Sequence, residues 1–227
     1  MPRPPRLAVG GIIYHVLNRA NARMTLFETR ADYQAFFQVL AEAHEQVPMR
    51  TLAFCVMPNH WHFILWPQAD GDLSAFMGWL TLTHTQRWHA AKGTTGLGHA
   101  YQGRFKSFPV QSDGHLLRVC RYVERNPLRA GLVDKAEAWP WGSLWQRLYE
   151  GQGMADGLLA PWPVDRPRDW LNLVNEAESQ AELVALRHAV ARGRPYGEET
   201  WVSQVAERLG LASALRPRGR PCHEKGS

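Results

Sequence analysis

Apolar side chains along the first 130 residues recur with two periods, one typical of strands and one typical of helices. Segments rich in β-branched and aromatic residues, bounded by glycine, proline or asparagine, predict strands at 12–19, 49–57, 60–67 and 101–110. Helical spacing of apolar residues predicts helices from Thr29 to Pro48, from Asp72 to the glycine-rich stretch 92–99, and over 114–126, ended by Pro127. The predicted order is therefore βαββαβα.

This order is that of a split ferredoxin-like sheet, an α+β fold with an antiparallel βαββαβ sheet and helices on one face. Successive side chains of a strand point to opposite faces. In the segment HWHFILWP, Trp61, Phe63 and Leu65 share one face, which we expect to pack against the helices. His60 and His62 then point to the other face, which we expect to be open to ligands.

The composition changes after about residue 150. Residues 1–150 are predicted to form one domain, and residues 151–227 a helical C-terminal extension with a basic tail. The sequence Arg-Gly-Arg-Pro occurs at 192–195 and again near the end of the chain, where it includes Arg218 and Arg220. Such a segment suits an A·T-rich minor groove, because glycine lets the backbone approach the groove floor. A basic, poorly ordered tail is the equally weighted alternative.

The chain of 227 residues is 45% hydrophobic, but it has no run of about twenty apolar residues that could span a bilayer. The N-terminal sequence MPRPPRLAVGG is basic and lacks the apolar stretch of a signal peptide. Cys55, Cys120 and Cys222 are odd in number and widely spaced, which argues against a disulfide framework and against structural zinc. We therefore expect a soluble, cytoplasmic protein.

Charge adds a candidate partner. The formal net charge is +5, the pI is near 9.4, and the chain contains ten tryptophans. Basic groups mixed with flat aromatic side chains suit a polyanion with stackable bases. Many basic proteins bind no nucleic acid, so composition makes nucleic acid a candidate partner and nothing more.

The third predicted helix has a polar face. At about 100° per residue, one arc of this helix is apolar and the other contains His115, Arg118, Tyr122, Arg125 and Asn126. Taken alone, Tyr122 is more often a residue at the edge of a core, and an isolated His-x-His pair is common. Together, His60, His62 and Tyr122 predict a site for metal-assisted phosphoryl transfer. A divalent ion would polarise the phosphate, arginines would hold neighbouring phosphates, and the phenolate oxygen would attack.

Five segments occur in order over about the first 145 residues: YHVLNRANARMTLF at 14–27, MPNHWHFILWP at 57–67, YQGRFKS at 101–107, RYVERNPLRAGLV at 121–133 and AWPWGS at 138–143. With these segments the chain resembles the REP-associated tyrosine transposases, relatives of the single-tyrosine HUH transposases that process single-stranded DNA. The resemblance implies a metal-dependent single-stranded DNA endonuclease and strand transferase. The implied substrates are hairpins of repetitive extragenic palindromes with a short tetranucleotide at the foot.

The resemblance also implies residue roles. His60 and His62 would be metal ligands, with Trp61 as the bulky residue between them. Tyr122 would be the nucleophile that forms a 5′-phosphotyrosine and frees a 3′-OH. Asn126 stands where related transposases have a glutamine that completes the metal shell, so it is the expected third ligand. The implied cofactor is Mg²⁺ or Mn²⁺, although two imidazoles alone would also accept zinc or nickel.

Polar residues around this site are expected to hold single-stranded or hairpin DNA. They are Arg3, Arg6, Asn18, Arg19, Arg104, Lys106, Arg118 and Arg125. Strand alternation places Arg104, Lys106 and Phe108 on one side of the fourth strand. For each cation the alternative is a solvated surface charge. We expect a monomer, with a homodimer that exchanges its tyrosine helices left open, and in similar proteins a C-terminal segment can cover the active site and regulate it.

Three other interpretations fit parts of the sequence. A binding module with the same sheet would stack bases on aromatic side chains of the open face, where this sequence places histidines. A zinc hydrolase would use water as its nucleophile and need a carboxylate base, for which Glu124 is the adjacent candidate. A folded but inactive DNA-binding relative is the third interpretation, although His60, His62 and Tyr122 are all present.

Overall fold

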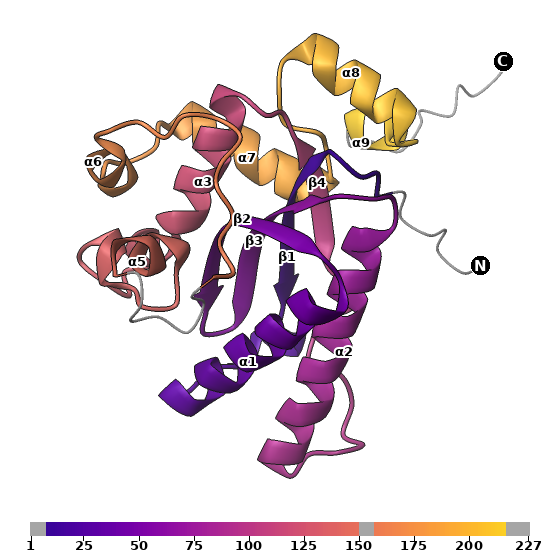
Figure 1. Cartoon of the computed structure of the whole chain (residues 1–227), viewed down its shortest axis with the longest axis vertical. Helices are drawn as coiled ribbons and strands as arrows, with labels where there is room; N and C mark the ends of the chain where they lie inside the picture. Colours follow the sequence, from indigo (N-terminus) through magenta and orange to yellow (C-terminus); the bar gives the residue numbers. More distant parts are fainter. Residues whose placement is uncertain (1–7, 150–156, 217–227) are drawn as a thin grey trace, which may run out of the picture.

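The computed structural model describes residues 8–149 and 157–216, and their centre is a four-stranded antiparallel sheet (Figure 1). Its strands, in the spatial order β2-β3-β1-β4, are β1 (Ile13–Arg19), β2 (Met49–Met57), β3 (His60–Pro67) and β4 (Lys106–Val110). All three pairs of neighbours run antiparallel. The predicted α+β fold with a split ferredoxin-like sheet is thus confirmed.

The first three strands match their predicted ranges closely, and β2 and β3 form the predicted hairpin around Pro58 and Asn59. The fourth strand is shorter than predicted. Regular pairing begins only at Lys106, and Tyr101 makes an isolated bridge to Ala20. Gly103 has a φ of +148°, a conformation that favours glycine, and it interrupts the extended backbone. The predicted alternation of Arg104 with the residues of this strand was therefore wrong.

Helices α1 (Arg30–Gln46) and α2 (Asp72–Lys92) cover one face of the sheet. Helix α1 begins at the predicted cap, where Thr29 accepts a hydrogen bond from the Asp32 backbone and Asp32 accepts one from the Thr29 backbone. The Phe36 ring of α1 lies 6.4 Å from Trp61 and 6.3 Å from Phe63. The prediction that the apolar side of β3 faces these helices is confirmed.

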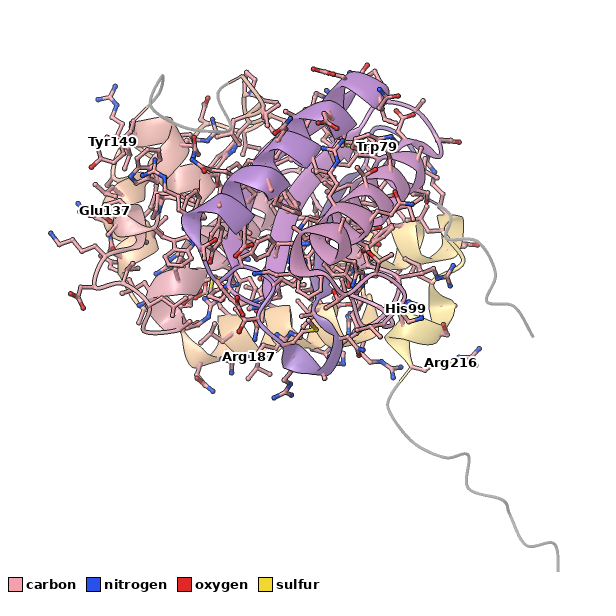
Figure 2. The ribbon with its side chains drawn as sticks, turned by 90° about the horizontal axis from the view of Figure 1, so that it is seen from below. Trp79, His99, Glu137, Tyr149, Arg187 and Arg216 are labelled. Carbon is pink, nitrogen blue, oxygen red and sulfur yellow. The ribbon has the colours of Figure 1, made fainter. Side chains whose placement is uncertain are left out.

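The opposite face of the sheet is also covered, in contrast to the open face that we predicted. It packs against α3 (Gly114–Glu124), α4 (Asn126–Arg129), α6 (Trp170–Asn175) and α7 (Gln180–Arg192). Figure 2 shows α2, marked by Trp79, and α7, marked by Arg187, on opposite sides of the molecule. As a result His62 is only 4% exposed. Pro127 does not end helical structure either, because it lies in the first turn of α4, where its missing N–H is tolerated.

The C-terminal extension crosses the edge of β4. Tyr196 donates its backbone N–H to Pro109 and accepts a hydrogen bond from the backbone N–H of Gln111, at 2.9 and 3.0 Å. Before this crossing, Leu186 of α7 is buried against the sheet face that carries His62. After it, Val205 of α8 (Glu199–Arg208) is buried on the side of α1 and α2. The extension therefore packs on both faces of the sheet, while the predicted domain boundary at residue 150 lies outside the described residues and stays a prediction.

Short elements complete the described chain: η1 (Asn21–Arg23), η2 (Ala136–Ala138), α5 (Ser143–Leu148) and α9 (Ala212–Leu215). Of the helices in the described ranges, none combines the length and the apolar character that crossing a membrane requires.

Candidate active site

Two imidazoles lie side by side at the start of β3. His60 and His62 point to the same face of the sheet, and their ring centroids are 5.1 Å apart with the rings nearly perpendicular. They are paired across the sheet with Arg19 and Leu17 of β1. The alternation of β3 therefore places both rings on the face opposite Trp61, as predicted. This face is covered by α3 rather than open, so His60 is half-buried and His62 is buried.

Both rings are oriented through Nδ1. The Nδ1 atom of His60 lies 2.6 Å from the side-chain oxygen of Asn59, which can only accept a hydrogen bond. The Nδ1 atom of His62 lies 2.8 Å from Nε2 of His15, a buried residue of β1 whose ring stacks on Phe108. The Asn59 oxygen places the proton of His60 on Nδ1, which leaves its Nε2 lone pair for a ligand. When His62 donates from Nδ1 to His15, its Nε2 lone pair is left for a ligand as well.

The environment favours the neutral form of these rings. Burial lowers the pKa of His15 to about 3 and that of His60 to about 4, with a further effect of Arg19 and Arg129 on His60. Burial also lowers the pKa of His62 well below its usual range, and the neighbouring imidazoles and arginines act in the same direction. Neutral imidazole is the form that binds a metal ion, so no proton needs to be displaced at neutral pH.

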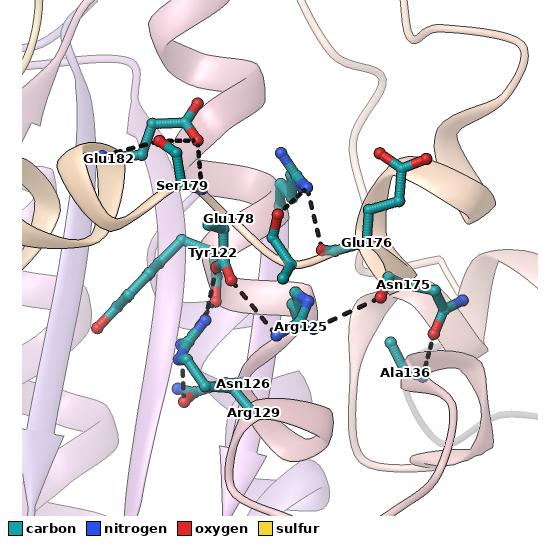
Figure 3. A network of polar contacts seen from close by, with 12 residues as sticks. Tyr122, Arg125, Asn126, Arg129, Ala136, Asn175, Glu176, Glu178, Ser179 and Glu182 are labelled. Atoms are coloured by element: carbon teal, nitrogen blue, oxygen red, sulfur yellow. Dashed lines mark hydrogen bonds and ion pairs between the residues drawn. The ribbon is translucent and has the colours of Figure 1, made fainter.

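Tyr122 of α3 lies against the second imidazole. Its ring meets that of His62 edge to face, with centroids 6.0 Å apart, and the residue is 9% exposed. The apolar side of the helix, which includes Val119 and Val123, packs against the sheet and fixes the height of Tyr122 over it. Figure 3 shows the Tyr122 hydroxyl directed toward the strands, away from Arg125. The structure thus brings a phenol and two imidazoles to one place.

Arg129 of α4 joins Tyr122 to Asn126. The centre of its guanidinium lies 4.2 Å from the centroid of the Tyr122 ring. One guanidinium nitrogen donates to the Tyr122 carbonyl at 3.1 Å and to the Asn126 side-chain oxygen at 3.0 Å. The Asn126 side-chain nitrogen is buried and has no hydrogen-bond partner. Asn126 is therefore held close to Tyr122, with its oxygen shared with an arginine.

The two arginines that were predicted to flank Tyr122 have different environments. Arg125 is largely buried and faces Glu178, at 3.4 Å, rather than a position for DNA. Arg118 is half-exposed and lies 3.9 Å from Glu182 of α7. Figure 3 shows that this network links α3 and α4 to the segment between α6 and α7. Of the predicted pair, only Arg118 keeps a side chain that a polyanion could reach.

These residues fit a divalent ion in part. Among residues 8–149 and 157–216, no cluster of three or more His, Cys, Asp or Glu side chains is arranged to hold a metal. His60 and His62 carry neutral nitrogens that would suit such an ion, and the Asn126 oxygen, which accepts from Arg129, keeps a second lone pair of the kind that Mg²⁺ and Mn²⁺ accept. Any further ligand would have to come from water or from a phosphate of the substrate.

A groove of about 900 Å³ lies at the β4 edge of the sheet. Its lining includes four residues that we predicted to contact DNA: Asn18, Arg19, Arg104 and Lys106. The C-terminal extension contributes Arg192, whose guanidinium is bonded to the carbonyls of Ser213 and Arg216. His60, His62 and Tyr122 do not line the groove, but Arg19, which does, is the β1 partner of His60 and lies on the same face of the sheet. It is therefore a basic groove that borders the strand next to His60.

Asn18 has a structural contact in this groove. Its side-chain nitrogen donates to the Gly103 carbonyl at 3.2 Å, and its oxygen accepts from the Arg19 backbone. Asn18 thus holds the loop before β4 in place. The predicted DNA contacts Arg3, Arg6, Arg218 and Arg220 lie outside the described residues.

Sequence reasoning missed three residues around the site: His15, Arg129 and Glu178. A signal existed for the first two, since His15 shares the β1 face with Leu17 and Arg129 follows Asn126 by three positions. Glu178 gave no such signal, because its position depends on how the extension packs.

Comparison with known proteins shows the family and the fold. Residues 8–126 match the family model described as transposase IS200 like, which is just over half of the chain. A Haemophilus influenzae protein named as a candidate REP-associated tyrosine transposase is 23% identical over 107 residues, which cover 44% of this chain and 61% of that relative. The match thus spans less than two thirds of the relative's length.

A solved structure of a REP-associated tyrosine transposase bound to a REP hairpin superposes with a TM-score of 0.55 at 19% identity. The superposition covers 79% of this chain and 92% of that one, so the fold extends beyond the residues of the family model. The fold and the matched residues confirm the resemblance seen in the sequence motifs. The chain belongs to the IS200-like transposase family.

Proposed function

We propose that this protein is a metal-dependent endonuclease and strand transferase that acts on single-stranded DNA beside REP-type hairpins, through a covalent 5′-phosphotyrosine. The observation that carries the proposal is the edge-to-face contact between Tyr122 and His62, whose Nε2 is left for a ligand. A nucleophile of the right kind and two metal-binding nitrogens therefore come together in one chain.

In the proposed reaction, the Tyr122 oxygen attacks the phosphorus of the scissile phosphate. The phenol gives up its proton, a bond forms between the tyrosine oxygen and phosphorus, and the bond between phosphorus and the 3′ oxygen breaks. The departing 3′ oxygen takes up a proton and becomes a free 3′-OH. Because the phosphate ester is conserved, the same or another 3′-OH can attack the phosphotyrosine and restore a phosphodiester without ATP.

His60, His62 and Asn126 would hold the Mg²⁺ or Mn²⁺ ion, which supplies polarisation of the scissile phosphate when it is bound. The other contributions come from residues of the chain itself. Arg129 holds the ring of Tyr122 and the amide of Asn126, and its positive charge would stabilise a phosphate that approaches Tyr122. Tyr122 is itself buried, which limits the access of water to the attacking residue.

The basic groove is the proposed path for the DNA strand. Arg19, Arg104 and Lys106 line it and can contact phosphates, which positions the strand without reading its sequence. The relative of known structure is described as bound to a REP hairpin. We extend that substrate to this chain because Arg19, a residue of the groove, is the β1 partner of His60. Tyr122 and the histidines belong to one chain, so a monomer would contain a complete set of reactive residues.

The rival hydrolase does not gain support from Glu124. This carboxylate is buried and accepts hydrogen bonds from Ser143 at 2.6 Å and from Trp170 at 2.8 Å. Ser143 is the first residue of α5 and Trp170 the first of α6, so the carboxylate joins α3 to these two helices. It is not placed to activate a water molecule at the histidines.

The test is a search for the covalent intermediate. The purified chain is incubated with single-stranded hairpin oligonucleotides and Mn²⁺, and the products are separated on a denaturing gel. We expect a protein–DNA adduct and a free 3′ end with the wild type, and neither with Tyr122→Phe. Binding of the hairpins without an adduct, over a broad panel of hairpin sequences, would favour a non-catalytic hairpin-binding protein.

A further inference from the structure

The C-terminal extension reaches the candidate active site through one carboxylate. Glu178 lies between α6 and α7, and its side chain is only 3% exposed. Its two oxygens face two arginines: Arg129 at 2.6 Å and Arg125 at 3.4 Å. Figure 3 shows Glu178 reaching over the helices toward both guanidinium groups. The extension therefore contributes a charged group to a region that otherwise consists of α3 and α4.

The stronger of these contacts leads directly to the reactive residues. Arg129 uses one nitrogen for Glu178 and the other for the Tyr122 carbonyl and the Asn126 side-chain oxygen. Its guanidinium plane also lies over the Tyr122 ring. Because a guanidinium is rigid and planar, fixing one nitrogen fixes the direction of the other. The position of Glu178 thus sets where Arg129 can hold Tyr122 and Asn126.

The two arginines and the one glutamate leave one positive charge uncompensated, which suits a phosphate. Two guanidinium groups, those of Arg125 and Arg129, face one carboxylate, that of Glu178. Without Glu178, two largely buried positive charges would lie near each other, and each would favour a rotamer that points to solvent. With it, Arg129 stays at Tyr122 and one net positive charge remains.

We propose that Glu178 is a positioning residue, which acts through Arg129 to hold the Tyr122 ring and the Asn126 oxygen in the geometry needed for the reaction. It touches neither the phosphate nor the imidazoles. The inference deepens the proposed function and rests on it for the catalytic consequence. The C-terminal extension then contributes to the reaction by orienting residues of the active site.

The environment of the Tyr122 ring can be measured by ¹⁹F NMR without any catalysis. The chain contains six tyrosines, which are replaced by 3-fluorotyrosine, and the ¹⁹F signal of Tyr122 is assigned by its loss in Tyr122→Phe. We expect Glu178→Gln to shift or broaden this signal while the other tyrosine signals stay in place. The control is Glu176→Gln, an exposed glutamate of the same segment that should leave the Tyr122 signal unchanged. An unchanged Tyr122 signal in Glu178→Gln would overturn the proposal.

A kinetic test reads the consequence. At saturating hairpin and Mn²⁺, Glu178→Gln should slow single-turnover adduct formation by about tenfold or more, the usual effect of losing a supporting contact. The dissociation constant of the hairpin should change less than twofold. In an Arg129→Met background, Glu178→Gln should add less than a further twofold, because the pathway is already broken. Full additivity, or a faster reaction in Glu178→Gln, would overturn the positioning role.

The two tests separate this inference from the proposed function. If the wild type forms no adduct but Glu178→Gln shifts the Tyr122 signal, the proposed function fails and the positioning contact stands. If the wild type forms the adduct and Glu178→Gln changes neither the Tyr122 signal nor the rate, the proposed function stands and the positioning role of Glu178 is overturned. Should Glu178→Gln fail to fold, Arg129→Lys keeps the charge without the planar group. It is expected to shift the signal and slow the reaction, and wild-type behaviour of this variant would overturn the proposal.

Discussion

Nε2 of His15 lies 2.8 Å from Nδ1 of His62, so a histidine of β1 supports a histidine of β3 from behind. His15 is 1% exposed, and burial lowers its pKa to about 3, so it is neutral and can accept a hydrogen bond. Its ring is fixed in turn by stacking on Phe108 of β4. Three strands therefore cooperate to aim one imidazole at the site.

This relationship predicts that His15 governs metal affinity. His15→Leu would leave the Nδ1–H of His62 unpaired and its ring free to turn, so Mn²⁺ affinity should fall about 10- to 100-fold. His15→Gln, which keeps an acceptor, should recover part of the loss. Mn²⁺ affinity is measured by isothermal titration calorimetry. The control is His44→Gln, because His44 forms a hydrogen bond with Thr51 rather than with His62. Wild-type affinity in His15→Leu would show that His15 only fills space.

Much of the fold followed from local signals in the sequence. The cap at Thr29 and the alternation around Trp61 are properties of a few adjacent residues, and both were predicted correctly. The burial of His62 was not, because it depends on Tyr122 of α3 and His15 of β1, which are far from His62 in the sequence. Residues fixed by strand period and helix face could be predicted. Glu178 could not, since no periodicity links it to Tyr122.

The sequence showed that Tyr122 and Asn126 share a helix face, but it did not show which residue pairs with the neighbouring arginines. Arg125 looked like a cation for DNA, yet its guanidinium is used within the protein. Charge alone does not distinguish a phosphate contact from a buried ion pair, because the same guanidinium suits both. The difference lies in tertiary packing.

Acid should destabilise the protein through its buried neutral histidines. His84 accepts a hydrogen bond from the Tyr101 hydroxyl at 2.7 Å, and burial lowers its pKa from 6.5 to about 4. A lowered histidine pKa contributes stability that is complete above pH 6.5 and is lost as the pH falls through 4. The shift corresponds to roughly 3 kcal/mol. In urea unfolding, the free-energy difference between wild type and His84→Gln should shrink by about that amount from pH 7 to 4, and a constant difference would contradict the assigned neutral state.

Glu124 should produce the opposite dependence on pH. Burial raises the pKa of this carboxyl above 4.5, although the hydrogen bonds from Ser143 and Trp170 oppose the shift. A raised carboxyl pKa contributes stability that is present below 4.5 and is lost as the pH rises through the folded-state pKa. Glu124→Gln can still accept from Trp170 and donate to Ser143 without a charge. Its stability relative to wild type should therefore increase from pH 5 to pH 8 in urea titrations, and a relative decrease would show that the carboxylate is stabilising when ionised.

The groove predicts a specific dependence of DNA binding on salt. Arg104 and Lys106 are exposed in its wall, so each can contact a phosphate of a single strand. Removing one such contact should reduce the slope of log K against log salt by about 0.7. Arg104→Ala and Lys106→Ala should each show this change in fluorescence anisotropy with a labelled hairpin. Arg30→Ala, an exposed arginine at the start of α1, is the control, and an equal effect there would point to net charge rather than to the groove.

The way the extension packs predicts that it unfolds together with the sheet. Leu186 of α7 is 1% exposed and belongs to the same core as Val123 of α3, whereas Val184 of α7 is 57% exposed. Leu186→Ala should therefore lower the free energy of unfolding by about 2–5 kcal/mol, and Val184→Ala should change it by less than about 0.5 kcal/mol.

If the extension and the sheet form one cooperative unit, far-UV circular dichroism and tryptophan fluorescence will report a single urea transition for Leu186→Ala, shifted to lower urea for both signals. Two separated transitions, with only the first displaced, would mean that the extension detaches from the sheet by itself. In that case Glu178 would leave Arg129 before the sheet unfolds, and adduct formation would be lost at the urea concentration of the first transition.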